Sequence, residues 1–98
     1  MGFFVGVVRI ELFIPQSRSL KDKRSVVHGV KDRLKALNAA VAEVDGQDLW
    51  QRATIAVSLV SGETAWLDKG IQDVRSIVER DHRALVSGFD WDVTPAPW

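Results

Sequence analysis

The sequence predicts an α+β domain in which two helices pack on one face of a four-stranded antiparallel sheet. Apolar residues alternate along four segments, recur at helical spacing along two others, and give the order β-α-β-β-α-β. A chain of 98 residues, 46% of them apolar, has the length of one domain and can bury one core. Right-handed crossovers then predict a single ferredoxin-like βαββαβ domain over residues 1–98.

The first strand is predicted over residues 5–14, where apolar and charged residues alternate before Pro15. The residues expected to face the core are Val8, Ile10, Leu12 and Ile14. Ser19 is a favourable N-cap for the first helix, with Asp22 in its first turn. This helix should run for about five turns, with Asn38 as its C-cap.

The next two strands are predicted to form an antiparallel hairpin over residues 40–44 and 50–60. The Asp-Gly-Gln-Asp sequence at 45–48 is typical of a turn. The residues of the longer strand that should face the core are Ala53, Ile55, Val57 and Leu59.

The second helix is predicted from about Thr64 to Arg80, because apolar residues recur there at helical spacing. Its apolar stripe consists of Leu67, Ile71, Val74, Ile77 and Val78. A last strand is expected over residues 84–93. Pro95 and Pro97 then predict a frayed terminus.

The residue types exclude several kinds of site. The chain has no cysteine, which rules out disulfide bonds and cysteine-ligated zinc. His28 and His82 are the two histidines, and neither lies in a pattern that defines a triad or a metal cluster. We therefore predict no catalytic residue, no metal and no cofactor.

The N-terminal apolar run shows no targeting signal. Arg9 and Glu11 interrupt it before a signal-peptide core or a membrane span is complete. We expect a cytoplasmic protein without a membrane partner.

A basic segment is the feature that most clearly predicts a kind of partner. Seven basic residues and two acids lie between positions 18 and 35, so this segment carries +5 in a chain whose formal net charge is zero. A helix places four of its side chains within an arc of roughly 60° beside the apolar face. These are Arg24, His28, Lys31 and Lys35.

The start of this helix also predicts an anionic partner. Lys21, Lys23 and Arg24 lie near a helix N-terminus, where the dipole favours anions. The candidate anion- or nucleic-acid-binding residues are Arg18, Lys21, Lys23, Arg24, His28, Lys31 and Lys35. The alternative is a solvated face on which Lys31 and Lys35 pair with acids. Lys23 falls near the centre of the apolar face, and its stem is expected to extend past the core edge.

The uncovered face of the sheet is the second candidate surface. Its predicted apolar residues are Val5, Val7, Phe13, Ala56 and Val60. Such a patch is typical of a protein interface, here between copies of the chain in a homo-oligomer. Base stacking on this face is not expected, because Thr54, Ala56 and Ser58 occupy the positions where an RNA-recognition motif has aromatics. Trp50 is expected to be a rim aromatic that closes the core beneath the hairpin, and the alternative is a stacking or cation–π site.

Three segments stand out as motifs: SLKDKRS at 19–25, AEVD at 42–45 and DLWQRA at 48–53. Together they resemble the YlxP-like family of small bacterial proteins, a domain of unknown function. The resemblance implies a ferredoxin-like domain in a bacterial cytoplasm, encoded near genes for translation initiation and ribosome maturation. It implies no catalytic residues.

These observations favour a non-enzymatic binding module, associated with RNA or the ribosome through a basic first helix. One alternative is a protein-interaction or oligomerisation module that acts through the open sheet face. Another is a small phosphate-handling enzyme that uses Lys23 and His28.

Overall fold

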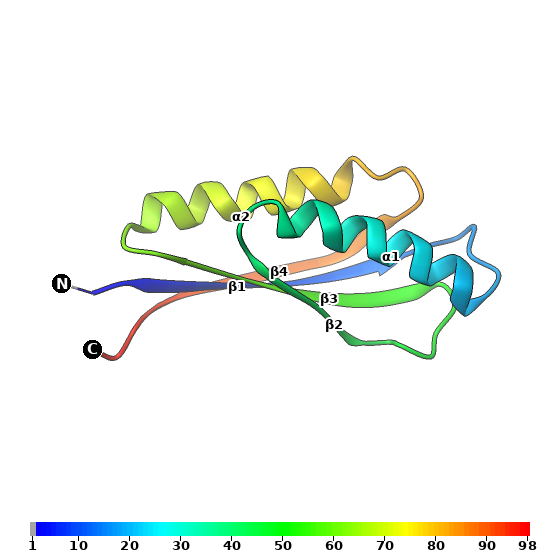
Figure 1. Ribbon diagram of the computed structural model, residues 1–98, viewed down its shortest axis with the longest axis horizontal. Coiled ribbons are helices and arrows are strands. Elements are labelled where there is room, and N and C mark those ends of the chain that lie inside the picture. Colours follow the sequence, from blue (N-terminus) through cyan, green and yellow to red (C-terminus); the bar gives the residue numbers. More distant parts are fainter. Residues whose placement is uncertain (1) are drawn as a thin grey trace.

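The computed structural model describes residues 2–98 and contains six regular elements. They are β1 (Phe4–Phe13), α1 (Leu20–Lys35), β2 (Ala40–Asp45), β3 (Arg52–Ser61), α2 (Thr64–Glu79) and β4 (Leu85–Pro95). The strands form one antiparallel sheet in the order β2-β3-β1-β4, and both helices cover the same face (Figure 1). The predicted ferredoxin-like fold is confirmed.

The core lies between the sheet and the two helices. The sheet residues predicted to face inward are all buried: Val8, Ile10, Leu12, Ile14, Ala53, Ile55, Val57 and Leu59. The helices add Val26, Val27, Val30, Leu34, Leu67, Ile71, Val74 and Val78. Each buried aliphatic side chain contributes about 1.5–3 kcal/mol relative to exposure, so this layer supplies most of the driving force for folding.

The predicted N-cap of α1 is present. The Asp22 N–H donates to Ser19 Oγ at 3.0 Å, and the Asp22 carboxylate accepts from the Arg18 N–H at 3.0 Å. The C-terminal end differs from the prediction, because Ala36 is the C-cap. Asn38 lies beyond the helix with φ of 61°, a left-handed conformation that asparagine tolerates and that turns the chain into β2.

The predicted fraying of the C-terminal segment is wrong. β4 continues to Pro95, opposite Phe4 of β1, and the Ala96 N–H donates to the Phe3 carbonyl at 2.8 Å. A proline can end this strand because β4 lies at an edge of the sheet and pairs with β1 alone. Pairing along the edge therefore outweighs the local preference of the two prolines.

An irregularity in β4 explains how its apolar residues reach the core. The pairing with β1 shifts between Glu11 and Leu12, so that Leu12 lies opposite Val86 and Ile10 lies opposite Phe89. Val86 and Phe89 are three positions apart, yet both pack against the core. The extra residue in β4 restores the inward direction that strict alternation would have lost.

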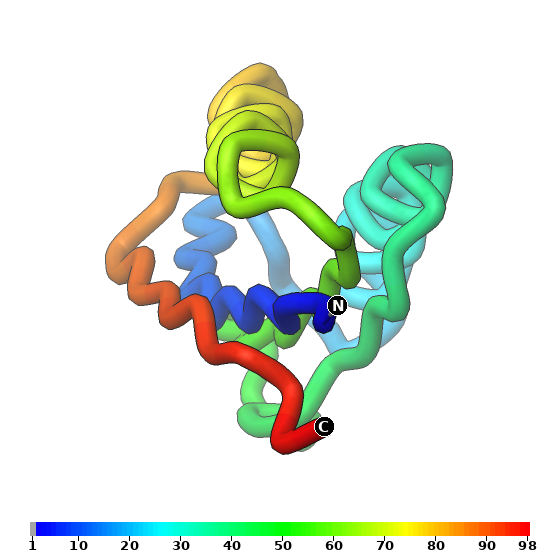
Figure 2. Tube along the Cα trace, turned by 90° about the vertical axis from the view of Figure 1, so that its left-hand side faces the viewer, coloured from blue at the N-terminus to red at the C-terminus, as the bar shows by residue number. Residues whose placement is uncertain are grey.

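The two helices divide the covered face between them. Figure 2 shows the two helices nearly end-on and separate from each other, α2 at the top and α1 to its right, with no helix on the opposite face of the sheet. α2 contacts β4 and α1 contacts β2, so the flank of α1 that points away from α2 forms an outer edge of the molecule. Neither helix in the described chain is long and apolar enough to cross a membrane.

Candidate anion-binding surface

Five of the predicted basic residues form an accessible surface along α1 and the turn before it. Four of them are exposed and Lys31 is half-buried. They are Arg18, Lys21, Arg24, Lys31 and Lys35, and we call this set the basic flank. His28 is also exposed, but its Nε2 lies 3.2 Å from Asp32 Oδ2 one turn along the helix. The flank therefore presents lysine and arginine charges beside a histidine that already has a partner.

The basic flank differs from the remaining basic residues in having no intramolecular partner. The partnered residues are Arg9 with Asp90, Lys23 with Glu43, Arg33 and Arg83 with Asp81, Lys69 with Asp73, Arg75 with Glu79, Arg80 with the Ser76 carbonyl, and Arg52 over the Phe13 ring. Within residues 2–98, no flank side chain pairs with an acid. The ion pairs expected for Lys31 and Lys35 as part of a merely solvated face are thus not formed in this part of the chain.

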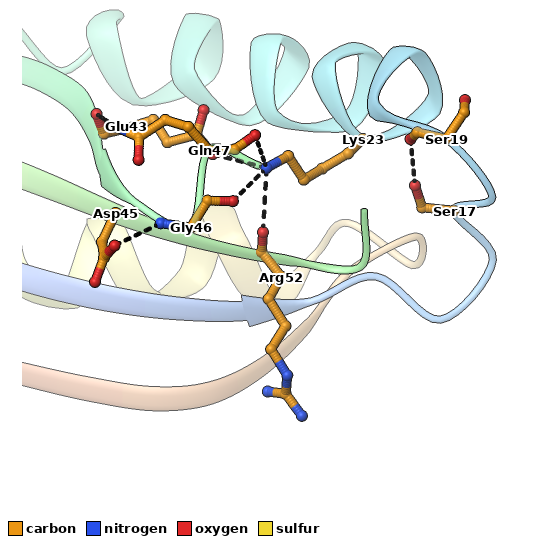
Figure 3. A network of polar contacts seen from close by, with 8 residues as sticks. All are labelled: Ser17, Ser19, Lys23, Glu43, Asp45, Gly46, Gln47 and Arg52. Carbon is orange, nitrogen blue, oxygen red and sulfur yellow. Dashed lines mark hydrogen bonds and ion pairs between the residues drawn. The ribbon is translucent and has the colours of Figure 1, made fainter. Parts of the chain in front are cut away.

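Lys23 does not belong to the basic flank. Its side chain is 1% exposed, and its Nζ donates to the carbonyl oxygens of Gly46 at 2.7 Å, Gln47 at 3.0 Å and Arg52 at 3.3 Å (Figure 3). The expectations that Lys23 reaches past the core edge and contacts an external anion are therefore wrong. The Lys23 side chain lies inside the protein, and its ammonium group is bound by the three carbonyl oxygens.

Glu43 completes the environment of this buried ammonium. Its Oε2 lies 3.3 Å from Lys23 Nζ, yet the oxygen is buried and makes no hydrogen bond. An ammonium has three N–H donors, and the three backbone carbonyls take all of them. Glu43 therefore balances the charge of Lys23 through electrostatic attraction alone.

The same contacts fix the loop between β2 and β3 to the start of α1. Gly46 has φ of 77°, a conformation that side-chain-bearing residues rarely adopt, and it presents its carbonyl to Lys23. On the other side, Gln51 Nε2 donates to the Pro15 and Ser17 carbonyls, both at 3.2 Å. Both ends of the loop therefore make polar contacts with residues 15–23, which contain the start of α1.

Trp50 does not close the core, contrary to the prediction. Its side chain is 57% exposed, and the neighbouring Leu49 is 52% exposed. Ile14 is 1% exposed, and its N–H donates to the Gln51 carbonyl at 2.7 Å. The Ile14 side chain is thus buried although Trp50 is exposed.

The open sheet face combines exposed apolar residues with charged ones. Val7 and Val60 are 49% and 65% exposed. The other predicted interface residues, Val5, Phe13 and Ala56, are half-buried. Arg52 covers the Phe13 ring at 5.1 Å from its centroid, and the ion pair between Arg9 and Asp90, at 3.0 Å, crosses the middle of the face.

The fold and the basic flank define a small ferredoxin-like domain with a candidate anion-binding surface. Residues 5–91 match the family model described as "Protein of unknown function (DUF503)", and the chain belongs to this family. It is also 29% identical over 76 residues to the uncharacterized protein YlxP of Bacillus subtilis (strain 168), covering 76% of this chain and 83% of that protein. The YlxP-like resemblance read from the sequence is therefore confirmed.

A solved structure with low sequence identity has a similar fold. It is LarC2, the C-terminal domain of a cyclometallase involved in the synthesis of the NPN cofactor of lactate racemase, in its apo form. The TM-score is 0.50 at 12% identity, and the match covers 98% of this chain and 58% of that one. This chain thus spans less than two thirds of the LarC2 structure, and the likeness is one of fold.

Replacing Lys23 tests its structural role. Lys23→Met should lower the free energy of unfolding by about 3 kcal/mol, because it leaves Glu43 and three carbonyls without their cation. Lys21→Met is the matched control: Lys21 is exposed, so its replacement should change stability by less than about 0.5 kcal/mol. Urea unfolding followed by circular dichroism measures both. Equal stabilities of the two variants would contradict the assignment.

Proposed function

We propose that this protein is a non-enzymatic RNA-binding module that contacts the phosphate backbone through the basic flank of α1. One observation carries the proposal: the five basic side chains that lack a partner in the described chain all belong to one segment, residues 18–35. Charges scattered for solubility would not be expected to sort in this way. The ribosomal setting implied by the family resemblance favours RNA among polyanions.

The arrangement of the flank suits a phosphate backbone. Arg24 and Lys35 are eleven residues apart, which separates them by about 16 Å along the helix axis. Several phosphates of one strand can therefore be contacted at once. Lys21 and Arg24 also lie in the first turns of α1, where the dipole opposes their charge, and a bound phosphate would relieve that opposition.

The binding should be largely independent of base sequence. Lysine and arginine contacts to phosphates position a nucleic acid but do not read its bases. The exposed positions of the open sheet face carry Val7, Val60 and the Arg9–Asp90 pair rather than stacking aromatics. Affinity that falls steeply with salt is the expected signature.

Neutralising two flank residues tests the proposal. Wild-type protein should bind a single-stranded RNA oligonucleotide with a log–log salt slope of about −3.5 for five contacts. Arg24→Gln combined with Lys31→Gln should reduce that slope to about −2.1 and weaken binding about tenfold at low salt. Fluorescence anisotropy titrations at several salt concentrations measure both quantities.

The matched control neutralises Lys69 and Arg75, which lie on α2 and pair with Asp73 and Glu79. Lys69→Gln combined with Arg75→Gln makes the same change in net charge and should leave the slope unchanged. No RNA binding by the wild type at low salt, or an equal loss in both double variants, would overturn the proposal.

Self-association through the open sheet face is a second candidate function. Val7 borders a shallow hollow whose other lining residues include Ala40, Ala42 and Ala56, and Val60 lies diagonally across from Val7 in the register of β1 and β3. Two exposed valines beside a hollow of small side chains can pack against the same surface of a second copy. This surface lies on the face opposite the helices, so both functions can coexist.

A charge on the open face should prevent self-association. Light scattering over a dilution series should give a mass above 10.9 kDa for the wild type at high concentration, and the monomer mass for Val60→Asp at every concentration. Gln72→Glu, which makes the same change in net charge at an exposed residue of α2, should behave as the wild type. A wild type that remains monomeric throughout would exclude this function.

A further inference from the structure

A second group of arginines lies on the side of α1 that faces α2. Asp81 lies just after α2, and its side chain is only 5% exposed. The Arg83 side chain donates two hydrogen bonds to it, from Nε to Oδ1 at 3.0 Å and from Nη2 to Oδ2 at 2.8 Å. The Arg83 N–H donates to the same Oδ1 at 3.0 Å. Arg33 of α1 then adds an Nη2 donor to Oδ2. One buried carboxylate thus orients two guanidinium groups.

Gly29 leaves room for Arg83 beside α1. A Cβ at this position would be 3.2 Å from Arg83 Nη2 and 3.7 Å from Arg33 Nη1. The first distance is shorter than ordinary van der Waals contact and the second is not, so the missing side chain makes room for Arg83. Hydrogen bonds to Asp81 orient both guanidinium groups.

This cluster carries more positive charge than its acid balances. The hydrogen bonds from Arg83 hold the pKa of Asp81 well below its usual range, so Asp81 supplies one negative charge at neutral pH. Arg33, Arg83 and the nearby Arg80 supply three positive charges. The neighbouring acid Glu79 is occupied by Arg75 at 2.8 Å. In this part of the described chain, the three positive charges of the arginines therefore exceed the negative charge of Asp81 by two.

The excess charge borders an open hollow of about 430 Å³, a size typical of small-molecule sites. The residues that line it are Arg33, Ile77, Arg80, Asp81, His82 and Arg83. Arg33 and Arg83 are 47% and 49% exposed, so N–H groups not used by Asp81 remain accessible. Ile77 and His82 add apolar and ring surface beside these donors.

We propose that this hollow binds a small organic phosphate. Arg33, Arg80 and Arg83 donate to its phosphate oxygens, while Ile77 and His82 contact its organic part. Guanidinium groups match phosphate oxygens in a bidentate geometry, and an excess of two positive charges complements a doubly charged phosphate. Arg33 and Arg24 are nine residues apart on α1, which places their side chains on opposite sides of the helix. This site is therefore separate from the basic flank, and its proposal does not depend on RNA binding.

Two probes and one charge variant test the site. Isothermal titration calorimetry at low salt, without divalent cations, should show saturable binding of inorganic pyrophosphate and tighter binding of ADP, which adds an organic part. Arg33→Gln should weaken both about tenfold, and it leaves the paired bonds between Arg83 and Asp81 in place. Lys69→Gln, the same charge change on α2, should alter neither affinity more than about twofold.

A second variant guards against a change in folding. Gly29→Ala keeps the charge and introduces a methyl group 3.2 Å from Arg83 Nη2, so it should displace that guanidinium group and weaken ADP binding while circular dichroism shows the native spectrum. No saturable binding of either probe, or an equal loss with Lys69→Gln, would overturn the proposal. ADP no tighter than pyrophosphate would overturn the roles of Ile77 and His82. Loss of RNA affinity with Arg33→Gln, equal to its loss of ADP affinity, would overturn the separation of the two sites.

Discussion

The buried ammonium of Lys23 is the contact on which the orientation of the basic flank depends. It joins the first turn of α1 to the carbonyls of Gly46, Gln47 and Arg52 in the β2–β3 connection, with Glu43 as its counter-ion. An apolar stripe alone lets a helix rotate by some degrees over a sheet, because aliphatic contacts are not directional. Three hydrogen bonds to fixed carbonyl oxygens remove that freedom. The rotation of α1 about its axis is therefore set by a polar contact at one end and by Val30 and Leu34 along its length.

That rotation decides which charges face outward. With Lys23 directed into the protein, Arg24 and Lys35 point to the outer edge beside β2, and Arg33 points to α2, where it meets Asp81. One helix thus serves two positively charged surfaces on opposite sides. The formal net charge of the protein is zero, but its basic residues divide into those with a partner in the described chain and those without one. This sorting supports an anionic partner more strongly than the number of basic residues does.

Sequence patterns predicted the elements well, because alternation and helical spacing report burial directly. The Ser19 cap and the inward faces of β1 and β3 follow from local preferences that the tertiary structure keeps. The role of Lys23 did not follow, because its partners are backbone carbonyls more than twenty positions away and carry no side-chain signal. The Arg33–Asp81 contact spans 48 positions and was missed for a similar reason. The end of the last strand was predicted wrongly, because a strand at the edge of a sheet tolerates a proline such as Pro95 that local preferences place outside strands.

The central claim is that Lys23 is a structural cation and that the flank lysines are accessible to an anionic partner. NMR spectra of the lysine ammonium groups in 15N-labelled protein test it directly, with and without a single-stranded RNA oligonucleotide. The account predicts a slowly exchanging Lys23 signal that RNA leaves in place, whereas the signals of Lys21, Lys31 and Lys35 shift and that of Lys69 does not. A Lys23 ammonium that exchanges as fast as the others, or that shifts with RNA as they do, would contradict the account.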